Sequence, residues 1–563
     1  MRKINSLFIL LAAFMIQMNV SAQDVLVVEP GVGTLNAAIT ANGGNKIYQL
    51  KAGEWYQLDG IVENVDYHLQ IIGEVPAAGA VPATLQTNAD AGGAVFGKMF
   101  DAKGDITLKN VYFVNADLSG VLPERFMTAS DSGSRVIIDN CILDPVSGNN
   151  GIVIEGGNAK VYFTNNKAIR TGHQLNPNCG HFFITDGAPY SLDTLLVENN
   201  TFVCAGTTLW AGGFNKYAQN YVKWNHNSII LQKSQIKWSI WEKDYFWTNN
   251  LMFDVQTQPW NTPWQPMPGA DVSKPKPCLI YADTIPGEVL PSTRTSLVAF
   301  NLHYRNPKLY TLVDQLNVQG KADGKTHIYL MPMIWPSDSL AICRETEMYA
   351  NKTAFPKWDY NNTITDVDPL FVDQNIYKHS DSLAKWTDYA TQIHAMGYPS
   401  DNYPAASLWT QWHWDPDGDV SNNSTWPVFN GVYTKADLLT ASSESLPLGD
   451  LNWFPTQKAL WMANKAKADA HLATVPNTRI DLTVGVKNTV LNSVNVYPNP
   501  VADVLYVSGN IKSDISIITV DGRLARSVKN ATSVNVSDLS NGVYIVRINQ
   551  NGASSSQKIL ISK

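Results

Sequence analysis

The chain has few cysteines and few charged side chains, and each shortage excludes a class of protein. Its 563 residues include five cysteines, an odd number, and their wide spacing matches no metal-binding motif. We therefore expect buried free thiols, with one disulfide, for example Cys179–Cys204, as the alternative. Charged residues make up only 16% of the chain and the net charge is −7, which argues against nucleic acid or an anionic membrane as a partner.

Long apolar runs are also scarce. The run Leu7–Phe14 follows a charged start at residues 1–3 and precedes Val20-Ser21-Ala22, a small-residue cleavage site before Gln23. This order is typical of a secretory signal peptide, and the run is too short to cross a bilayer. We therefore expect residues 1–22 to be removed on export and the mature protein to carry no transmembrane segment.

The last 70 or so residues contain short runs of alternating apolar residues, separated by Asp521-Gly522 and Asn541-Gly542. Such runs predict a small antiparallel β-sandwich over residues 493–563. These runs and turns, in this order and beginning with residues 496–500 (VYPNP), resemble the C-terminal sorting domain of the type IX secretion system of the Bacteroidota. The resemblance implies that the secretion machinery reads and cleaves this domain, often exchanging it for a surface anchor. We expect a secreted or outer-membrane surface-attached protein; the alternative is an ordinary accessory β-sandwich.

A sequence repeat fills the middle of the chain. Its pattern is apolar, any, apolar, any, Asn, any, any, apolar, with spacings of 30, 25, 34, 27, 23 and 52 residues between the Asn slots. The slots hold Asn110, Asn140, Asn165, Asn199, His226, Asn249 and Asn301. A period of this length with short strands indicates a solenoid, and the segments lack a 3.6-residue period. Each coil would bury its apolar residues by stacking on the next, with Asn in a left-handed turn and its amide bonded to the next coil.

The repeat resembles the right-handed parallel β-helix of the pectate-lyase-like superfamily, and more narrowly uncharacterised Bacteroidota proteins that join such a helix to a sorting tail. We thus expect an all-β fold: a β-helix with a loop-rich, partly helical C-terminal decoration over residues 23–475, a linker over 476–492 and the sorting domain from 493. Leu69–Glu74 fits a first coil. Residues 366–371 and 446–451 fit closing coils, and residues 381–395 and 455–473 read as helices.

A second family of strands lies between the Asn repeats, for example at residues 152–155, 208–211 and 236–241. We expect Ile236, Trp238 and Ile240 to face inward, and Trp224 and Trp247 to be core residues. The outward residues would then form one row across the coils, made of Glu155, Asp186 or Thr185, Trp210 and Lys237.

Aromatic and acidic residues supply candidate binding sites. Tryptophan faces pack on sugar rings, and the candidate tryptophans are Trp210, Trp241, Trp260, Trp264 and Trp412, although any one of them could instead be a packing residue. The closely spaced Asp415, Asp417 and Asp419 around Gly418 suggest a Ca²⁺ loop, without the downstream Glu of an EF-hand; the alternative is an acidic surface turn.

The superfamily resemblance implies polysaccharide lyases and glycoside hydrolases. A lyase needs a base and a cation beside the sugar carboxylate, for which Lys237, Arg170 and His181, with His173, are the candidates. A hydrolase needs paired carboxylates, and Glu155, Asp186 and Glu198 are the nearest set. Neither set forms a recognised lyase signature. We expect a protein that binds and could cleave polysaccharide, lyase-like on an acidic glycan; the alternatives are a non-catalytic glycan-binding protein and an adhesin or structural surface protein.

Overall fold

The computed structural model contains two compact units, residues 1–480 and 481–563. It describes residues 24–482 and 495–563, except for internal segments at 172–179, 186–190, 206–207, 213–216, 233–235, 238, 240, 258, 261–281, 283, 286–289, 323–328, 331–347, 378–429, 509–511, 520–523 and 551–552.

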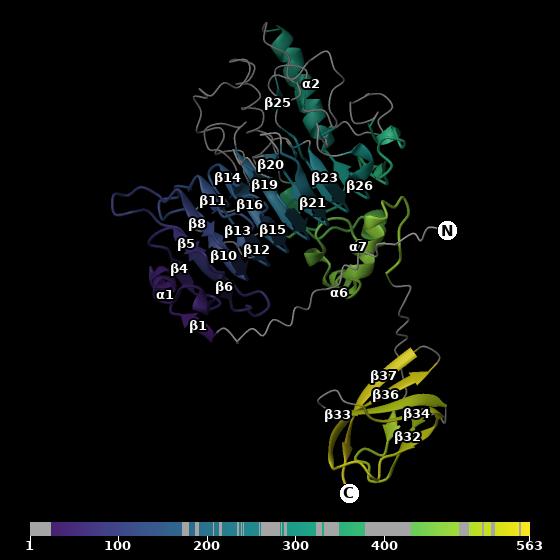
Figure 1. The fold of residues 1–563 in the computed structure, drawn as a ribbon. Helices are drawn as coiled ribbons and strands as arrows, with labels where there is room; N and C mark the ends of the chain where they lie inside the picture. The colour runs from purple at the N-terminus through teal and green to yellow at the C-terminus, as the bar shows by residue number, and fades with distance from the viewer. Residues whose placement is uncertain are drawn as a thin grey trace, which may run out of the picture. The chain divides into compact units, whose positions relative to one another are not determined.

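Three parallel sheets form the first unit (Figure 1). Sheet A contains β1 (Asp24–Val28), β3 (Lys46–Leu50), β6 (Leu69–Gly73), β9 (Ile106–Lys109), β12 (Arg135–Asp139), β15 (Lys160–Thr164), β18 (Thr194–Glu198), β21 (Gln219–Asn225), β23 (Glu242–Thr248), β26 (Thr295–Ala299) and β29 (Trp358–Asn361). Sheet B contains β2 (Gly31–Val32), β4 (Trp55–Gln57), β7 (Ala83–Gln86), β10 (Val111–Val114), β13 (Ile142–Leu143), β16 (Lys167–Thr171), β19 (Thr201–Ala205), β22 (Ser228–Ile230), β24 (Leu251–Phe253), β27 (Leu302–Tyr304) and β30 (Ile364–Thr365). Sheet C contains β5 (Val62–Val65), β8 (Lys98–Lys103), β11 (Arg125–Ala129), β14 (Asn150–Ile154), β17 (His181–Ile184) and β20 (Thr208–Ala211).

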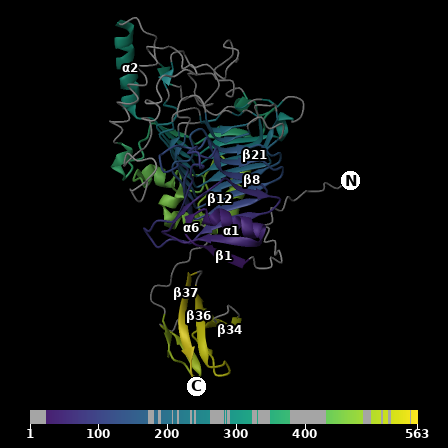
Figure 2. The same ribbon diagram turned by 90° about the vertical axis from the view of Figure 1, so that its left-hand side faces the viewer.

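The chain passes from sheet C to A to B and then begins the next coil, so every strand pairs in parallel with its equivalent one coil away (Figures 1 and 2). Val136 pairs with Val161, and Val161 with Leu195, which are the same positions of successive repeats. These side chains are fully buried. Because a single coil has no second layer to cover its apolar residues, stacking buries them, and the fold is the predicted parallel β-helix.

The Asn slots adopt the predicted left-handed conformation. Positive φ values of 54° to 61° occur at Asn110, Asn140, Asn165, Asn199, His226 and Asn249. One amide link between slots is present, from Asn140 Nδ2 to Asn110 Oδ1 at 2.8 Å. This turn joins each strand of sheet A to the next strand of sheet B.

The continuous amide ladder lies one residue later than predicted. The backbone N–H of Asn166 donates to Asn200 Oδ1 at 2.8 Å, and that of Asn200 donates to Asn227 Oδ1 at 3.1 Å. Asn250 and Asn301 continue the ladder, and all five side chains are fully buried. Each amide therefore satisfies buried backbone groups of its neighbouring coils.

The last repeat is shifted by one residue from its predicted register. Val298, and not Leu297 or Ala299, pairs with the inward Trp247. Phe300 has the positive φ of 56°, and Asn301 belongs to the amide ladder. A shift by one residue exchanges the two faces of a strand, so Leu297 and Ala299 point away from the core.

Trp224 and Trp247 are core residues and Ile236 faces inward, as predicted, while Trp238 and Ile240 lie outside the described residues. The first coil is not where the sequence placed it. Trp224 and Trp247 are at most 1% exposed in the core. Two coils precede β6, and helix α1 (Thr34–Asn42) packs Leu35 and Ile39 on the core at that end. The loop between β2 and β3 therefore caps the solenoid.

The C-terminal part of this unit packs along the side of the solenoid. Its elements are α6 (Pro455–Ala463), α7 (Lys465–Ala473), η4 (Ala436–Thr440) and η5 (Leu451–Trp453). The predicted helix over 455–473 is thus two helices, broken at Asn464. Leu472 packs on Phe246 and Leu297 of the outer face of sheet A. The helices therefore cover a side of the solenoid.

Residues 446–451 do not form the predicted closing coil. They belong to a segment that we call the strap, residues 442–453. Gly449 donates its N–H to the Asn249 carbonyl at 2.8 Å, and Asn452 Nδ2 donates to the Asn199 carbonyl at 2.8 Å. Because Asn199 lies two coils before Asn249, the strap runs across the coils along the turns between sheets A and B.

The remaining elements lie outside the three parallel sheets. They are η1 (Gly43–Asn45), η2 (Pro291–Thr293), η3 (Gln374–Ile376), the unpredicted α2 (Pro307–Ala322), and the pair β25 (Pro259–Trp260) and β28 (Tyr329–Leu330). The predicted helix at 381–395 lies outside the described residues.

Cys141 agrees with the expectation of buried free thiols. Cys141 is a free thiol, and burial raises its pKa to about 12. Cys179, needed for the alternative disulfide, lies outside the described residues.

The second unit is the predicted antiparallel β-sandwich. One sheet contains β31 (Val496–Tyr497), β32 (Val504–Val507) and β35 (Ser533–Asn535), and the other contains β33 (Ser513–Thr519), β34 (Leu524–Ala531), β36 (Gly542–Gln550) and β37 (Ala553–Ile561). Its own core includes Leu505, Ile517, Val546 and Ile559. The predicted turn at 521–523 lies outside the described residues.

Candidate functional site

Arg170 lies in a buried ion pair. Its Nε lies 2.6 Å from Asp144 Oδ1, and the two side chains are 5% and 2% exposed. Arg170 lies within β16 and has a positive φ of 56°. A buried guanidinium that is bonded to a carboxylate has a structural role already and would have to leave it to reach a substrate.

The structure brings Lys237 and Trp210 together, but in the core. They form a parallel β-bridge, and Trp210 pairs with Phe183, which pairs with Ile152. The predicted outward row with Glu155 and Thr185 is therefore wrong, because Trp210 is in register with the inward residues Phe183 and Ile152 and not with Thr185 and Glu155. Asp186 lies outside the described residues.

Glu242 links these two side chains. Its Oε2 lies 2.9 Å from Lys237 Nζ, and its Oε1 accepts from Trp210 Nε1 at 3.0 Å. Lys237 Nζ also lies 4.1 Å from the centre of the Tyr245 ring. Lys237 is 1% exposed, so the charge is neutralised inside the solenoid and does not face solvent.

The other predicted residues are scattered. His181 begins β17, is half-buried, and its N–H donates to Asn150 Oδ1 at 2.9 Å. Glu155 is paired with Arg125, while Glu198 is buried beside Lys223, so the hydrolase carboxylates do not come together. Trp241 is half-exposed before β23, and the backbone of Trp260 pairs with Tyr329. Predicted residues outside the described part are His173, Trp264, Trp412, Asp415, Asp417 and Asp419.

Sequence reasoning missed a polar surface on the first strands of sheet C, which we call the sheet C charge row: Glu63, Lys98, Asp101 and Lys103. Lys103 Nζ lies 3.0 Å from Glu63 Oε2 and 3.5 Å from Asp101 Oδ2. Lys98 Nζ lies 3.1 Å from the same Asp101 oxygen. The lysine side chains are 22% and 39% exposed, so solvent reaches both.

Hydroxyls and a second ion pair extend this row onto the next coils. Ser130 Oγ donates to Asp101 Oδ1 at 2.8 Å, and Lys98 Nζ donates to Thr128 Oγ1 at 3.3 Å. Arg125 Nη1 lies 3.0 Å from Glu155 Oε1, whose side chain is 44% exposed. Beyond this point the same outward row becomes apolar and buried, at Val153, Ile184 and Ala211.

Two charges of the row, on Asp101 and Lys103, are held ionised. Burial opposes the ionisation of Asp101, but the hydrogen bond from Ser130 and the charge of Lys98 outweigh it, and its pKa is lowered. The hydrogen bond to Glu63 raises the pKa of Lys103. A row of fixed donors and acceptors suits sugar hydroxyls and carboxylates, while a lysine with a raised pKa is a poor proton acceptor.

A signal for this row is present in the sequence. Asp101 and Lys103 stand at alternate positions of one strand, so both face outward. The second family of strands is predicted only from residue 152 onward. The prediction therefore does not include β5, β8 and β11.

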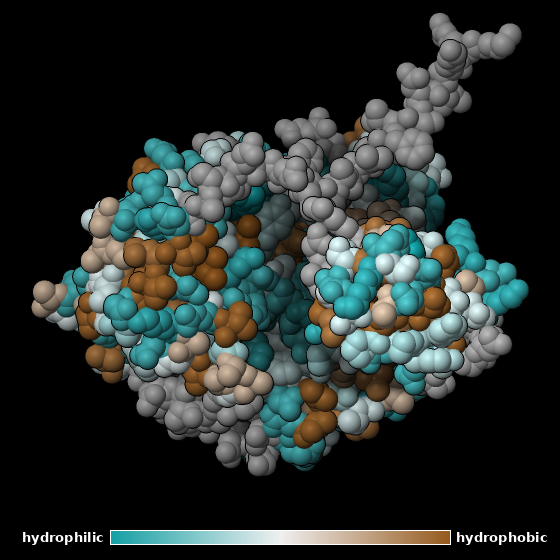
Figure 3. Space-filling view, turned by 90° about the horizontal axis from the view of Figure 1, so that it is seen from below, coloured by the Kyte–Doolittle hydropathy of each residue, from teal (hydrophilic) through white to brown (hydrophobic). Residues whose placement is uncertain are grey.

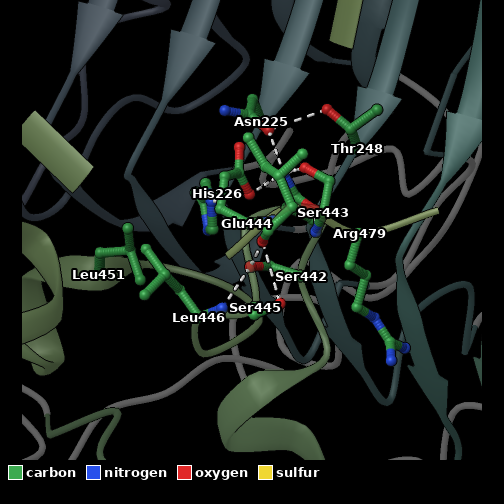
Figure 4. Close-up of polar contacts among 12 residues, drawn as sticks. Asn225, His226, Thr248, Ser442, Ser443, Glu444, Ser445, Leu446, Leu451 and Arg479 are labelled. Atoms are coloured by element: carbon green, nitrogen blue, oxygen red, sulfur yellow. Dashed lines mark hydrogen bonds and ion pairs between the residues drawn. The ribbon is translucent and has the colours of Figure 1, made fainter. Parts of the chain in front are cut away.

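A separate polar cluster fastens the strap to the solenoid (Figure 4). Glu444 Oε2 lies 3.3 Å from His226 Nε2 and accepts from Asn249 Nδ2 at 3.1 Å. Asn249 also accepts the N–H of Ser443 at 2.7 Å. Burial opposes ionisation of Glu444, but the hydrogen bond with His226 outweighs it and lowers its pKa. All these side chains are at most 1% exposed, so the cluster holds the strap in place.

Among the described residues, no three His, Cys, Asp or Glu side chains are grouped so that they could hold a metal ion. Since residues 415–419 lie outside this part, the Ca²⁺ loop stays a prediction.

The comparisons with known proteins concern the second unit. Residues 495–562 match the family described as "Secretion system C-terminal sorting domain". A search of curated proteins found no match to the chain. In the described part of the chain, no helix is both long enough and apolar enough to cross a membrane.

Proposed function

We propose that this protein, which its sorting domain marks for secretion and attachment at the cell surface, binds polysaccharide along the outer face of sheet C. The observation that carries the proposal is the sheet C charge row, whose cations and carboxylates lie on adjacent strands. Parallel strands are about 4.8 Å apart, so equivalent side chains form a regular series of polar contacts for an extended chain of sugars.

An acidic glycan is the substrate class that this row favours. Lys98, Lys103 and Arg125 each already bind a carboxylate at 3.0 to 3.1 Å. A sugar carboxylate could replace the more exposed partners, Glu63 and Glu155, whose side chains are 46% and 44% exposed. Because such contacts are between charges near the surface, their strength falls as salt increases.

Cleavage by a lyase mechanism is the second candidate. It requires a basic group that can take a proton from the sugar, and Lys98 and Lys103 are the solvent-accessible lysines of the row. The raised pKa of Lys103 and the buried ion pairs of Lys237 and Arg170 favour binding over cleavage. An adhesin or rigid spacer is the remaining alternative, and it requires no glycan contact.

The test is retention of the exported protein on a panel of acidic and neutral glycans, with absorbance followed at the band of unsaturated uronates. We expect retention on an acidic glycan, weaker at high salt. The double substitution Lys98→Ala/Lys103→Ala removes two charge-assisted contacts and should weaken binding by about tenfold or more. A rise in absorbance would identify a lyase.

Lys160→Ala is the matched control, since Lys160 forms an equally exposed ion pair with Asp193 on sheet A. The control should bind as the wild type does. Absence of retention on every glycan, or an equal loss in the control, would refute the proposal and favour the structural alternative.

A further inference from the structure

Within the described residues, the first strand of the solenoid leaves one edge of sheet A open. β1 stands at the end of the eleven-strand order and pairs with β3 on one side. In Figures 1 and 2 it is the outermost element at this end, beyond α1. An edge strand presents unpaired N–H and C=O groups on which another strand can pair.

The side chains of β1 do not protect this edge. Edge strands are usually guarded by lysine or proline, and β1, with the sequence DVLVV, contains neither. Val25 and Val27 are 55% and 44% exposed, and the half-buried Ile47 of β3 lies beside Val25 on the same face. Figure 3 shows apolar surface gathered on the N-terminal end of the solenoid.

The opposite edge of the same sheet is protected. β29 has the polar sequence WDYN, and Asn361 Nδ2 donates to the Pro476 carbonyl at 3.0 Å. The next residue, Asn362, donates to the Asn477 carbonyl at 2.8 Å. A segment of the chain thus lies against β29, whereas no second strand of the described part pairs with β1.

We propose that β1 pairs in an antiparallel manner with β1 of a second copy of this chain. A two-fold axis through Leu26 places Val25 of one copy opposite Val27 of the other, on the outer face of one continuous sheet. The strand is thus self-complementary, as a two-fold interface requires, and opposed valines form a favourable cross-strand pair.

The charges beside β1 agree with this pairing. Asp24 lies 2.9 Å from Lys46, and Glu29 lies 2.7 Å from Lys51, so each acidic residue flanking the strand is already neutralised within its own copy. Two copies can therefore approach without an unbalanced repulsion between these carboxylates.

The first test is the mass of the exported chain in solution, measured by light scattering over a range of concentrations. We expect a concentration-dependent dimer. The double substitution Val25→Lys/Val27→Lys places charges in the interface and should leave a folded monomer, whose unfolding curve matches that of the wild type at concentrations where the wild type is monomeric. Val318→Lys is the control, because Val318 is 75% exposed on α2, and this variant should still dimerise.

The second test fixes the register. Residues directly opposite in an antiparallel pair have Cα atoms about 4.5–5.5 Å apart, which suits a disulfide, whereas diagonal residues are about 7–8 Å apart. Cross-linked dimer should therefore form when Val25→Cys and Val27→Cys chains are mixed, and in neither sample alone. A wild-type chain that is monomeric at every concentration, or equal cross-linking in the unmixed samples, overturns the proposal.

Discussion

Lys237 Nζ lies 2.9 Å from Glu242 Oε2 inside the solenoid, where the two side chains are 1% and 2% exposed. Two opposite charges in an apolar core are stable only together, since each compensates the desolvation of the other. The same lysine had been predicted as a catalytic base on the outer face. Because the lysine lies in a buried ion pair, we expect its mutation to lower the free energy of unfolding and not to remove a catalytic step.

Lys237→Ala should destabilise the first unit by about 3–5 kcal/mol, because it leaves the Glu242 carboxylate buried without its cation. The measurement is urea unfolding followed by tryptophan fluorescence. The double substitution Lys237→Met/Glu242→Leu should recover much of this loss, since it removes both charges together.

Lys109→Ala is the control, because the exposed pair of Lys109 with Asp139 should contribute no more than about 1 kcal/mol. A stable Lys237→Ala variant that had lost glycan cleavage would contradict the structural role and restore the catalytic one.

Asp254 should make the protein less stable as pH rises. Burial raises its pKa from the ordinary 3.8 to about 7. Between these values the unfolded chain has lost the proton that the folded chain retains, so folding stability falls from about pH 4 to pH 7 and then stays level. The contribution is at most about 4 kcal/mol.

Asp254→Asn keeps an oxygen for the N–H of Asn306, which Asp254 Oδ1 accepts at 2.6 Å. This variant should gain stability over the wild type at pH 8 but not at pH 4, as measured by melting temperature. If the melting temperatures of the variant and the wild type instead differed more at pH 4 than at pH 8, Asp254 would be ionised in the folded protein.

Asn227→Ala should interrupt the amide ladder. Asn227 Oδ1 accepts the N–H of Asn200 at 3.1 Å, and its Nδ2 donates to the Val197 carbonyl at 3.0 Å. Removing the amide leaves two buried backbone groups without these partners, at a cost of about 2–4 kcal/mol. Urea unfolding measures the loss. Asn42→Ala, at a half-exposed side chain that donates to Ala38, is the control and should change stability by less than 1 kcal/mol, roughly the value of one exposed hydrogen bond.

Deletion of residues 541–563 should stop export. It removes β36 and β37, which form half of the four-stranded sheet of the sorting domain. We expect the shortened chain to accumulate in the periplasm, as judged by resistance to protease added to intact cells. Arg526→Ala, which removes the exposed ion pair with Asp538 and one hydrogen bond to the Asn535 carbonyl, should be exported normally. Surface display of the shortened chain would contradict the assignment.

Local sequence patterns determined the fold of both units. The apolar alternation specifies which face of a strand is buried, and Asn tolerates the left-handed turn, so the positive φ values at Asn110 to Asn249 could be expected from the repeat alone. The tail was predicted for the same reason, because its alternating strands and turns are short and each is encoded by adjacent residues.

Stacking of the coils determined the register of β26 and the position of the amide ladder, which the sequence did not predict. Val298 faces the core because it pairs with the inward Trp247 of β23. Leu297, Val298 and Ala299 are all apolar, so the sequence alone does not distinguish the face that is buried. The ladder formed at Asn166 and Asn200 because their amides meet buried backbone groups of the neighbouring coils.

For function too, some features could be predicted from the sequence and others depended on the tertiary structure. The sequence by itself determined an exported β-helix with a sorting tail, because these depend on short-range patterns. Only the tertiary structure placed Lys237 and Arg170 in buried ion pairs and grouped Lys98, Asp101 and Lys103 on the outer face of sheet C. Burial and charge pairing arise between residues on different coils and strands, and the register between coils is a property of the folded chain.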